Sequence, residues 1–127
     1  MNDTEIKYFT PKEAAMTLPL VKQIVKDILD TGFIIKSIAD ALDGKIENND
    51  EVKSLLIKMN NYLGELEEIG CFYKDWNFTV GMVDFPAMIN EEEVMLCWQT
   101  GEDDILYYHR PEDGFAGRRK IPQRYLD

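Results

Sequence analysis

The sequence predicts an α+β fold, in which a long N-terminal antiparallel helical hairpin packs on a small antiparallel β-meander with an irregular C-terminal tail. Three observations predict it. Apolar residues recur three and four apart through residues 11–69, the period changes to two after Gly70, and residues 110–127 are rich in Pro, Gly and Arg. The 127 residues fit one domain, 1–127, whose core needs neither a disulfide nor a metal for stability.

The first helix is predicted over residues 11–43. The segment Thr10–Glu13 has the pattern of a capping box, with Thr10 as the N-cap, a proline at the first helical position and Glu13 reaching back. Gly44 offers a stop. The apolar or small residues of this helix form a heptad seam, which indicates a face turned toward a partner. The seam consists of Ala14, Leu18, Val21, Val25, Ile28, Gly32, Ile35, Ala39 and Leu42.

The second helix is predicted over residues 49–69, with Asn48 or Asn49 as its cap and Gly70 at its end. A short connection makes the two helices antiparallel neighbours. The second seam consists of Val52, Leu55, Met59, Tyr62, Leu66 and Ile69. The simplest interpretation of these coiled-coil-like seams is that they are ordinary core positions. The alternative is that they form a homo-oligomer through the hairpin.

Residues 71–109 are predicted to form the antiparallel sheet, and residues 110–127 the Gly/Arg-rich tail. Turn-like residues at 90–93 and 100–103 separate the last strands. The candidate strands are Cys71–Lys74, Val80–Phe85, Ala87–Ile89, Val94–Gln99 and Ile105–His109.

The expected register decides which side chains share a face. If both turns are four-residue loops, Asp84 lies opposite Gln99, and Val94 lies opposite His109. Because side chains alternate between the two faces of a strand, Asp84 and Cys97 then share one face. His109 is expected on the other face, so Cys97 and His109 cannot meet without a slip of register.

The charge distribution disfavours one class of partner. The net charge is -10, and it divides into -12 over residues 1–109 and +2 over residues 110–127. An acidic body repels phosphate backbones, which disfavours nucleic-acid binding. The basic tail is expected either to dock on the acidic body or to hold an anion.

The sequence also predicts a soluble, cytoplasmic protein without a membrane span. Only two cysteines occur, Cys71 and Cys97, and their spacing is not that of a metal motif, which fits free thiols in a reducing cytosol. Residues Met1–Lys7 are polar and acidic, without the apolar stretch of a signal peptide. No apolar run approaches the ~20 residues that cross a bilayer.

A set of short motifs follows in order along residues Phe9–Ile121. They are Phe9-Thr10, Ala14-Ala15, Leu18-Pro19-Leu20-Val21, Gly81-Met82-Val83-Asp84-Phe85-Pro86-Ala87, Leu96-Cys97-Trp98, Gly101-Glu102, His109 and Gly114-Phe115-Ala116-Gly117-Arg118. Taken together, they resemble an uncharacterised bacterial and archaeal family known as domain of unknown function 2203. The chain departs from that family at Arg119-Lys120, where Gln-Pro is more frequent. The resemblance implies no activity.

Four residues are of types that bind zinc or iron: Asp84, Cys97, Glu102 and His109. They support an alternative function, a metal-dependent hydrolase-like enzyme, although the expected register separates Cys97 from His109. Phosphate-loop, dinucleotide, nucleophile-elbow and zinc-protease motifs are absent from the sequence. The sequence therefore nominates no catalytic residue and no cofactor.

The favoured function is a non-enzymatic interaction or small-ligand and anion-binding domain. Asp84 interrupts an apolar strand and needs a partner, and Arg118 or Arg119, Arg118 first, follows a glycine-containing loop that could bring it close. An Asp84–Arg118 pair is expected, either as a structural clasp or as the frame of a pocket for a small anionic ligand. The candidate ligand-binding residues are Asp84, Gly114, Phe115, Gly117 and Arg118.

Overall fold

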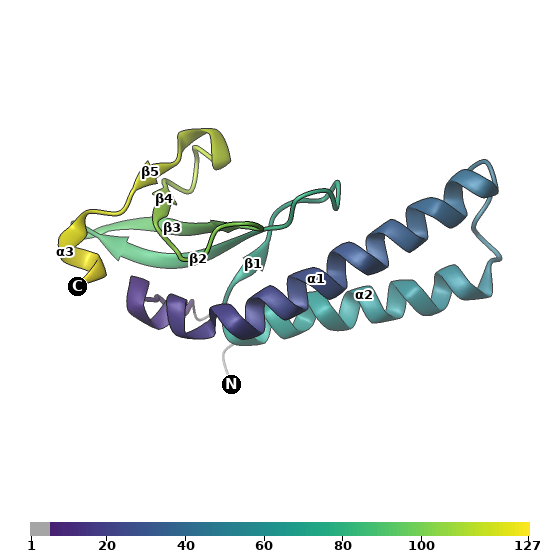
Figure 1. The fold of residues 1–127 in the computed structure, drawn as a ribbon, viewed down its shortest axis with the longest axis horizontal. Coiled ribbons are helices and arrows are strands. Elements are labelled where there is room, and N and C mark those ends of the chain that lie inside the picture. The colour runs from purple at the N-terminus through teal and green to yellow at the C-terminus, as the bar shows by residue number, and fades with distance from the viewer. Residues whose placement is uncertain (1–5) are drawn as a thin grey trace.

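The computed structural model describes residues 6–127, which form two long helices followed by a five-stranded sheet (Figure 1). Helix α1 spans Pro11–Ala41 and helix α2 spans Asp50–Ile69, and the two pack against each other as an antiparallel hairpin. The predicted α+β fold is confirmed. Part of the segment in which the sequence predicts no signal peptide, residues 1–5, lies outside the described residues.

Local sequence signals set the ends of both helices. The Thr10 hydroxyl accepts a hydrogen bond from the Glu13 amide at 3.1 Å, and the Glu13 carboxylate accepts one from the Thr10 amide at 2.9 Å, which completes the predicted capping box. The Asn49 side chain accepts from the amide of Val52 at 2.9 Å and caps α2. Gly70 ends α2 with a φ of 109°, a left-handed conformation that favours glycine.

The seams of the hairpin form much of its core. Val25, Ile28, Met59 and Leu66 are all buried, as the heptad pattern predicts. Burial weakens toward the far end of the hairpin, where Leu42 is 39% exposed. Val52 of α2, near the same end, is nevertheless buried, so the loss of burial concerns the seam of α1.

The far end of the hairpin extends beyond the sheet (Figure 1). Several large apolar side chains in its outer half are exposed to solvent, the most exposed being Phe33 at 70% and Ile57 at 63%. Exposed apolar residues of this size are compatible with self-association, which stays a prediction.

The sheet is an antiparallel meander in the order β1-β2-β3-β4-β5. Its strands are β1 Phe72–Tyr73, β2 Met82–Ile89, β3 Glu92–Gln99, β4 Tyr107–His109 and β5 Arg119–Lys120. Strand β2 is continuous through Pro86, although the sequence pattern divides it there. Pro86 lies beyond the part of β2 that β1 covers, and its carbonyl accepts a hydrogen bond from the Phe9 amide at 2.8 Å. Proline is tolerated at such an edge because it has no amide to donate.

The tail is more ordered than the sequence predicts. Besides β5, it contains a 3₁₀ turn, η1, at Phe115–Gly117 and a short helix, α3, at Gln123–Leu126. Strand β5 pairs with β4, which ties the tail to the sheet edge. This pairing was not visible in the sequence because a two-residue strand carries no period of its own.

The two faces of the sheet have different roles. Phe85 and Leu96 point from one face into the core that α1 covers with Ala14, Leu18 and Val21. The segment that contains η1 lies on the side of the sheet away from α1 (Figure 1). None of the helices within residues 6–127 is long and apolar enough to cross a membrane.

Asp75 fixes the loop between β1 and β2. Its carboxylate is 5% exposed and accepts hydrogen bonds from the amides of Asn77, Thr79, Val80 and Gly81 at 2.7–3.2 Å. Burial acts to raise the pKa of Asp75, but these four backbone donors outweigh it and hold the pKa below its ordinary value of 3.8.

Replacing Asp75 with alanine is expected to lower the free energy of unfolding by roughly 2–4 kcal/mol at neutral pH, since buried amides lose their acceptor. A depressed folded-state pKa contributes stability that is present above the unfolded pKa and is lost as the pH falls through the folded value. Urea unfolding between neutral and acidic pH measures both effects. Asp40→Ala, on the exposed surface of α1, is the control. Equal stability losses in the two variants would contradict this role.

Candidate metal centre

Strands β2 and β3 bring Asp84 directly opposite Cys97. The sequence predicts Gln99 opposite Asp84, and this is wrong by two residues. The turn is shorter than expected, because Asn90 and Glu91 alone form it, with φ angles of 53° and 66°. Two consecutive positive φ angles match the right-handed twist of a hairpin. A shift of two residues keeps every side chain on its expected face, so Asp84 and Cys97 share a face as predicted.

The register between β3 and β4 differs by one residue from the prediction, and that reverses a face. His109 lies opposite Met95 rather than Val94, and Cys97 lies opposite Tyr107. His109 is therefore on the same face as Cys97, and the prediction that they point to opposite faces is wrong. A one-residue slip moves a whole strand's side chains to the other face.

The cause is the connection between these strands, which spans residues 100–106 instead of a four-residue loop. Glu102 organises it. The Gln99 amide donates to the Glu102 carboxylate at 2.8 Å, and the Trp98 indole donates to the Glu102 carbonyl at 2.9 Å. The side chain of Glu102 is thus engaged in the turn.

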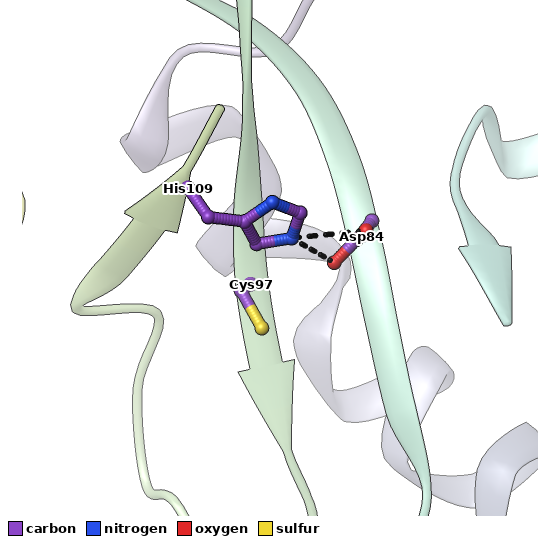
Figure 2. Close-up of side chains that lie close together, drawn as sticks. All are labelled: Asp84, Cys97 and His109. Atoms are coloured by element: carbon purple, nitrogen blue, oxygen red, sulfur yellow. Dashed lines mark hydrogen bonds and ion pairs between the residues drawn. The ribbon is translucent and has the colours of Figure 1, made fainter. Parts of the chain in front are cut away.

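Asp84, Cys97 and His109 form a compact buried cluster (Figure 2). They are 4%, 1% and 4% exposed, and one potential ligand atom from each lies within 4.8 Å of the other two. Nε2 of His109 is 3.1 Å from both carboxylate oxygens of Asp84. Three of the four candidate metal ligands named from the sequence therefore meet, and Glu102 lies in the adjacent turn.

The hydrogen bonds of His109 identify which ring nitrogen has a lone pair that can bind a metal. Nδ1 lies 2.8 Å from the carbonyl oxygen of Arg110. A carbonyl only accepts, so Nδ1 carries the proton. In a neutral imidazole, Nε2 then holds a lone pair, and that lone pair faces the Asp84 carboxylate. Two acceptors at 3.1 Å need a proton or a cation between them, which is a proton on His109 or on Asp84, or a metal ion.

Burial disfavours the charged forms of the other two residues. It raises the pKa of Asp84, and the opposing influence of His109 only partly offsets this. Burial and then the nearby Asp84 carboxylate raise the pKa of the Cys97 thiol to about 12. A thiol with that pKa is neutral at pH 7 and is a poor nucleophile on its own. Without a metal, the cluster is therefore unsuited to cysteine-based catalysis.

The cluster lines one wall of a pocket of about 250 Å³. Lys74, which directly follows β1, and Met82, at the start of β2, extend that wall. The tail supplies the opposite side through Pro111, Gly114 and Phe115. Gly114 has a φ of 66°, which suits glycine and turns the chain over the site. The pocket thus lies between the sheet face and the tail and is partly open to solvent.

Arg118 has a different partner from the one the sequence predicts. Its Nη2 donates to the Glu102 carboxylate at 2.7 Å and to the Cys97 carbonyl at 3.2 Å. Its guanidinium stacks on the rings of Tyr107 at 4.1 Å and Phe115 at 4.6 Å. The predicted Asp84–Arg118 ion pair is not formed, because Arg118 pairs with Glu102 at 2.7 Å and the Asp84 carboxylate faces Nε2 of His109 at 3.1 Å. Arg118 instead fastens the tail and the β3–β4 turn beside the pocket.

The ligand-binding residues expected from the sequence divide into two groups. Asp84, Gly114 and Phe115 line the pocket. Arg118 and Gly117 do not line it. The Arg118 guanidinium stacks on the Phe115 ring at 4.6 Å, and a Cβ atom added to Gly117 would lie 2.6 Å from the Asp113 side chain, so this glycine allows a tight turn of the tail.

Sequence reasoning missed two features of the pocket. One is Lys74, which follows β1 and whose amide donates to the Met82 carbonyl at 2.8 Å. The period-two pattern places Lys74 on the face of Asp84 once β1 is paired with β2. The other is the Arg110 carbonyl, since a backbone acceptor leaves no signal in a sequence.

Comparison with known proteins gives a family. No curated protein and no solved structure matches the chain significantly. A family model described as "Uncharacterized conserved protein (DUF2203)" matches residues 7–121, a range that includes the cluster, the wall of the pocket and the tail that covers it. The match spans most of the 127 residues, and the chain therefore belongs to the DUF2203 family.

Proposed function

We propose that this protein binds a divalent transition metal, with zinc as the first candidate, through Asp84, Cys97 and His109. One observation carries the proposal. Nε2 of His109 faces both Asp84 oxygens at 3.1 Å while its Nδ1 is held by the Arg110 carbonyl. Metal-binding histidines commonly donate their second ring N–H to a carbonyl in this way, which fixes the tautomer and orients the ligand atom.

The donor set fits this class of metal. One thiolate, one imidazole and one carboxylate suit borderline ions such as Zn²⁺ or Co²⁺ better than Mg²⁺ or Ca²⁺, which prefer oxygen alone. A divalent cation also balances the charges of the Asp84 carboxylate and the Cys97 thiolate. That balance removes the cost of burying two anions side by side.

The spacing requires a modest contraction on binding. Ligand atoms around a tetrahedral zinc lie roughly 3.3–3.6 Å apart, since the metal–ligand bonds are about 2.0–2.3 Å long. The Asp84–His109 separation of 3.1 Å is already close to that range. The widest separation in the cluster is no more than 4.8 Å, so the ligand atoms need to approach by about 1 Å.

Three protein ligands leave one coordination position for another molecule, and the pocket supplies the room. The proposed activity is therefore metal-centred binding of a small ligand by a non-enzymatic domain. The alternative is a metal-dependent hydrolase-like enzyme, which the three-ligand arrangement favours because catalytic zinc sites keep one open position. Metal-dependent turnover of activated esters or phosphate esters would favour the enzyme, and its absence the binding domain.

The test is a direct measurement of metal content. Protein that has been stripped with a chelator is expected to take up one equivalent of Zn²⁺ or Co²⁺ per chain, measured by elemental analysis after desalting and by isothermal titration calorimetry. Binding is also expected to raise the melting temperature, because the metal binds the folded state. A protein that retains no metal after desalting and shows no thermal shift would contradict the proposal. In that case, the charge between His109 and Asp84 would be a proton.

A further inference from the structure

The pocket beside the proposed metal centre contains one positive charge without an ion-pair partner. Among the cations of the tail, Arg118 is paired with Glu102 at 2.7 Å, and Arg110 is paired with Asp113 at 2.9 Å. Lys74 also lines the pocket, and no ion pair in the described part of the chain involves it. It is close enough for its charge to act on the Asp84 carboxyl and favour its ionised form.

The position of Lys74 follows from the strand pairing. Phe72 lies opposite Asp84, and the Lys74 amide continues the same ladder to Met82. Lys74 therefore stands two residues along the strand from Phe72, on the face that carries the metal ligands. Lys74 is exposed to solvent and lines the pocket together with Met82, and its flexible stem lets its ammonium group turn toward a ligand there.

The charges of the site indicate that the ligand is negatively charged. A divalent metal is neutralised by the Asp84 carboxylate and the Cys97 thiolate, and the neutral His109 adds no charge. With Lys74 the site carries one net positive charge. A monoanion that occupies the open coordination position and contacts Lys74 would bring that charge to zero. The three ligands are buried, whereas Lys74 is exposed at the edge of the pocket, where it can meet the charged end of an entering anion.

The lining and the volume of the pocket indicate the size and polarity of the ligand body. Met82, Pro111 and Phe115 give the pocket an apolar lining. A phosphate would need an arginine for bidentate hydrogen bonds, but the nearby Arg118 is already bonded to Glu102 and to the Cys97 carbonyl. The volume of about 250 Å³ equals that of roughly eight water molecules at ~30 Å³ each. That is the size of a small carboxylic acid with a short apolar or aromatic body.

We infer that this pocket binds a small monocarboxylate, whose oxygen completes the metal coordination while its charge contacts Lys74 and its apolar body lies against Phe115. This inference rests on the proposed function. It names the class of ligand that the metal-binding site takes, and it adds Lys74 as the residue that selects it.

The experiment uses the full chain with one equivalent of Co²⁺ bound, which has a visible spectrum that reports its coordination. Titration with benzoate is expected to change that spectrum saturably and to raise the melting temperature of the loaded protein. Acetate is expected to bind more weakly, because it fills less of the apolar pocket. Inorganic phosphate is expected to compete poorly with benzoate.

Variants identify the role of Lys74. At saturating Co²⁺, Lys74→Met is expected to raise the dissociation constant for benzoate about 10–100-fold, the range for losing a charge-assisted hydrogen bond. Lys74→Arg should recover much of the affinity because it retains the charge. Lys58→Met, at an exposed position on α2, is the matched control and should bind benzoate like the wild type.

The outcomes separate this inference from the proposal beneath it. If the protein binds one Co²⁺ but benzoate leaves the spectrum unchanged, the carboxylate inference fails and the metal site stands. Equal benzoate affinity in Lys74→Met and the wild type would also overturn it, as would tighter binding of phosphate than of benzoate. If Co²⁺ itself does not bind, both proposals fall together.

Discussion

Replacing Cys97 with serine is expected to weaken Co²⁺ binding by roughly 100-fold or more, because a hydroxyl is a far poorer ligand than a thiolate for a borderline metal. The thiolate-to-metal charge-transfer absorption in the near ultraviolet should disappear as well. Calorimetric titration of chelator-treated protein measures the first effect, and absorption spectroscopy of the Co²⁺ form measures the second.

The second cysteine provides a matched control. Cys71 is also buried, but its thiol faces the Leu66 carbonyl at 3.5 Å and lies outside the cluster. Cys71→Ser is therefore expected to keep both the Co²⁺ affinity and the charge-transfer band. His109→Gln should lose affinity as Cys97→Ser does. If Cys71→Ser and Cys97→Ser behave alike, Cys97 is not a ligand.

The largest loss of stability is expected on the other face of β2. Phe85 is the residue next to Asp84, is fully buried, and packs edge-to-face on Phe9 with ring centroids 5.3 Å apart. Phe85→Ala removes a large buried side chain and leaves a cavity between the sheet and α1. The expected loss is about 3–5 kcal/mol in the free energy of unfolding, measured by urea denaturation.

Phe85→Leu is the conservative control, and because it keeps most of the buried volume it is expected to be much milder, losing less than about 2 kcal/mol. Metal binding by the folded fraction of either variant should persist, since Phe85 points away from the cluster. A loss of metal binding in stable Phe85→Leu would show that the two faces of the sheet are not independent.

The sequence determines the helical part of this protein almost completely. The Thr10 and Glu13 capping box and the glycine stop at Gly70 are interactions between residues at most a few positions apart. Such signals act within the first or last turn of a helix and need no tertiary context. The heptad seams likewise predict which faces meet, because a helical period of 3.6 is fixed by the backbone.

The sequence determines the site only as a set of residue types. Asp84, Cys97 and His109 can be nominated as metal ligands from their chemistry, and so can Glu102. Residue type does not show that Glu102 leaves the set to bind Arg118. The two residues are 16 positions apart, and their pairing depends on how the tail returns across the sheet.

Only the tertiary structure decided that Cys97 and His109 share a face. The decision depends on whether the segment between β3 and β4 shifts the register by an even or an odd number of residues, because side chains alternate along a strand. The Glu102 hydrogen bonds and its ion pair with Arg118 accompany the longer connection that sets this register. These contacts are nonlocal, whereas a sequence pattern reports only local preferences. A one-residue change in the register between β3 and β4 thus decides whether the imidazole of His109 lies on the same face as Asp84 and Cys97 or on the opposite face.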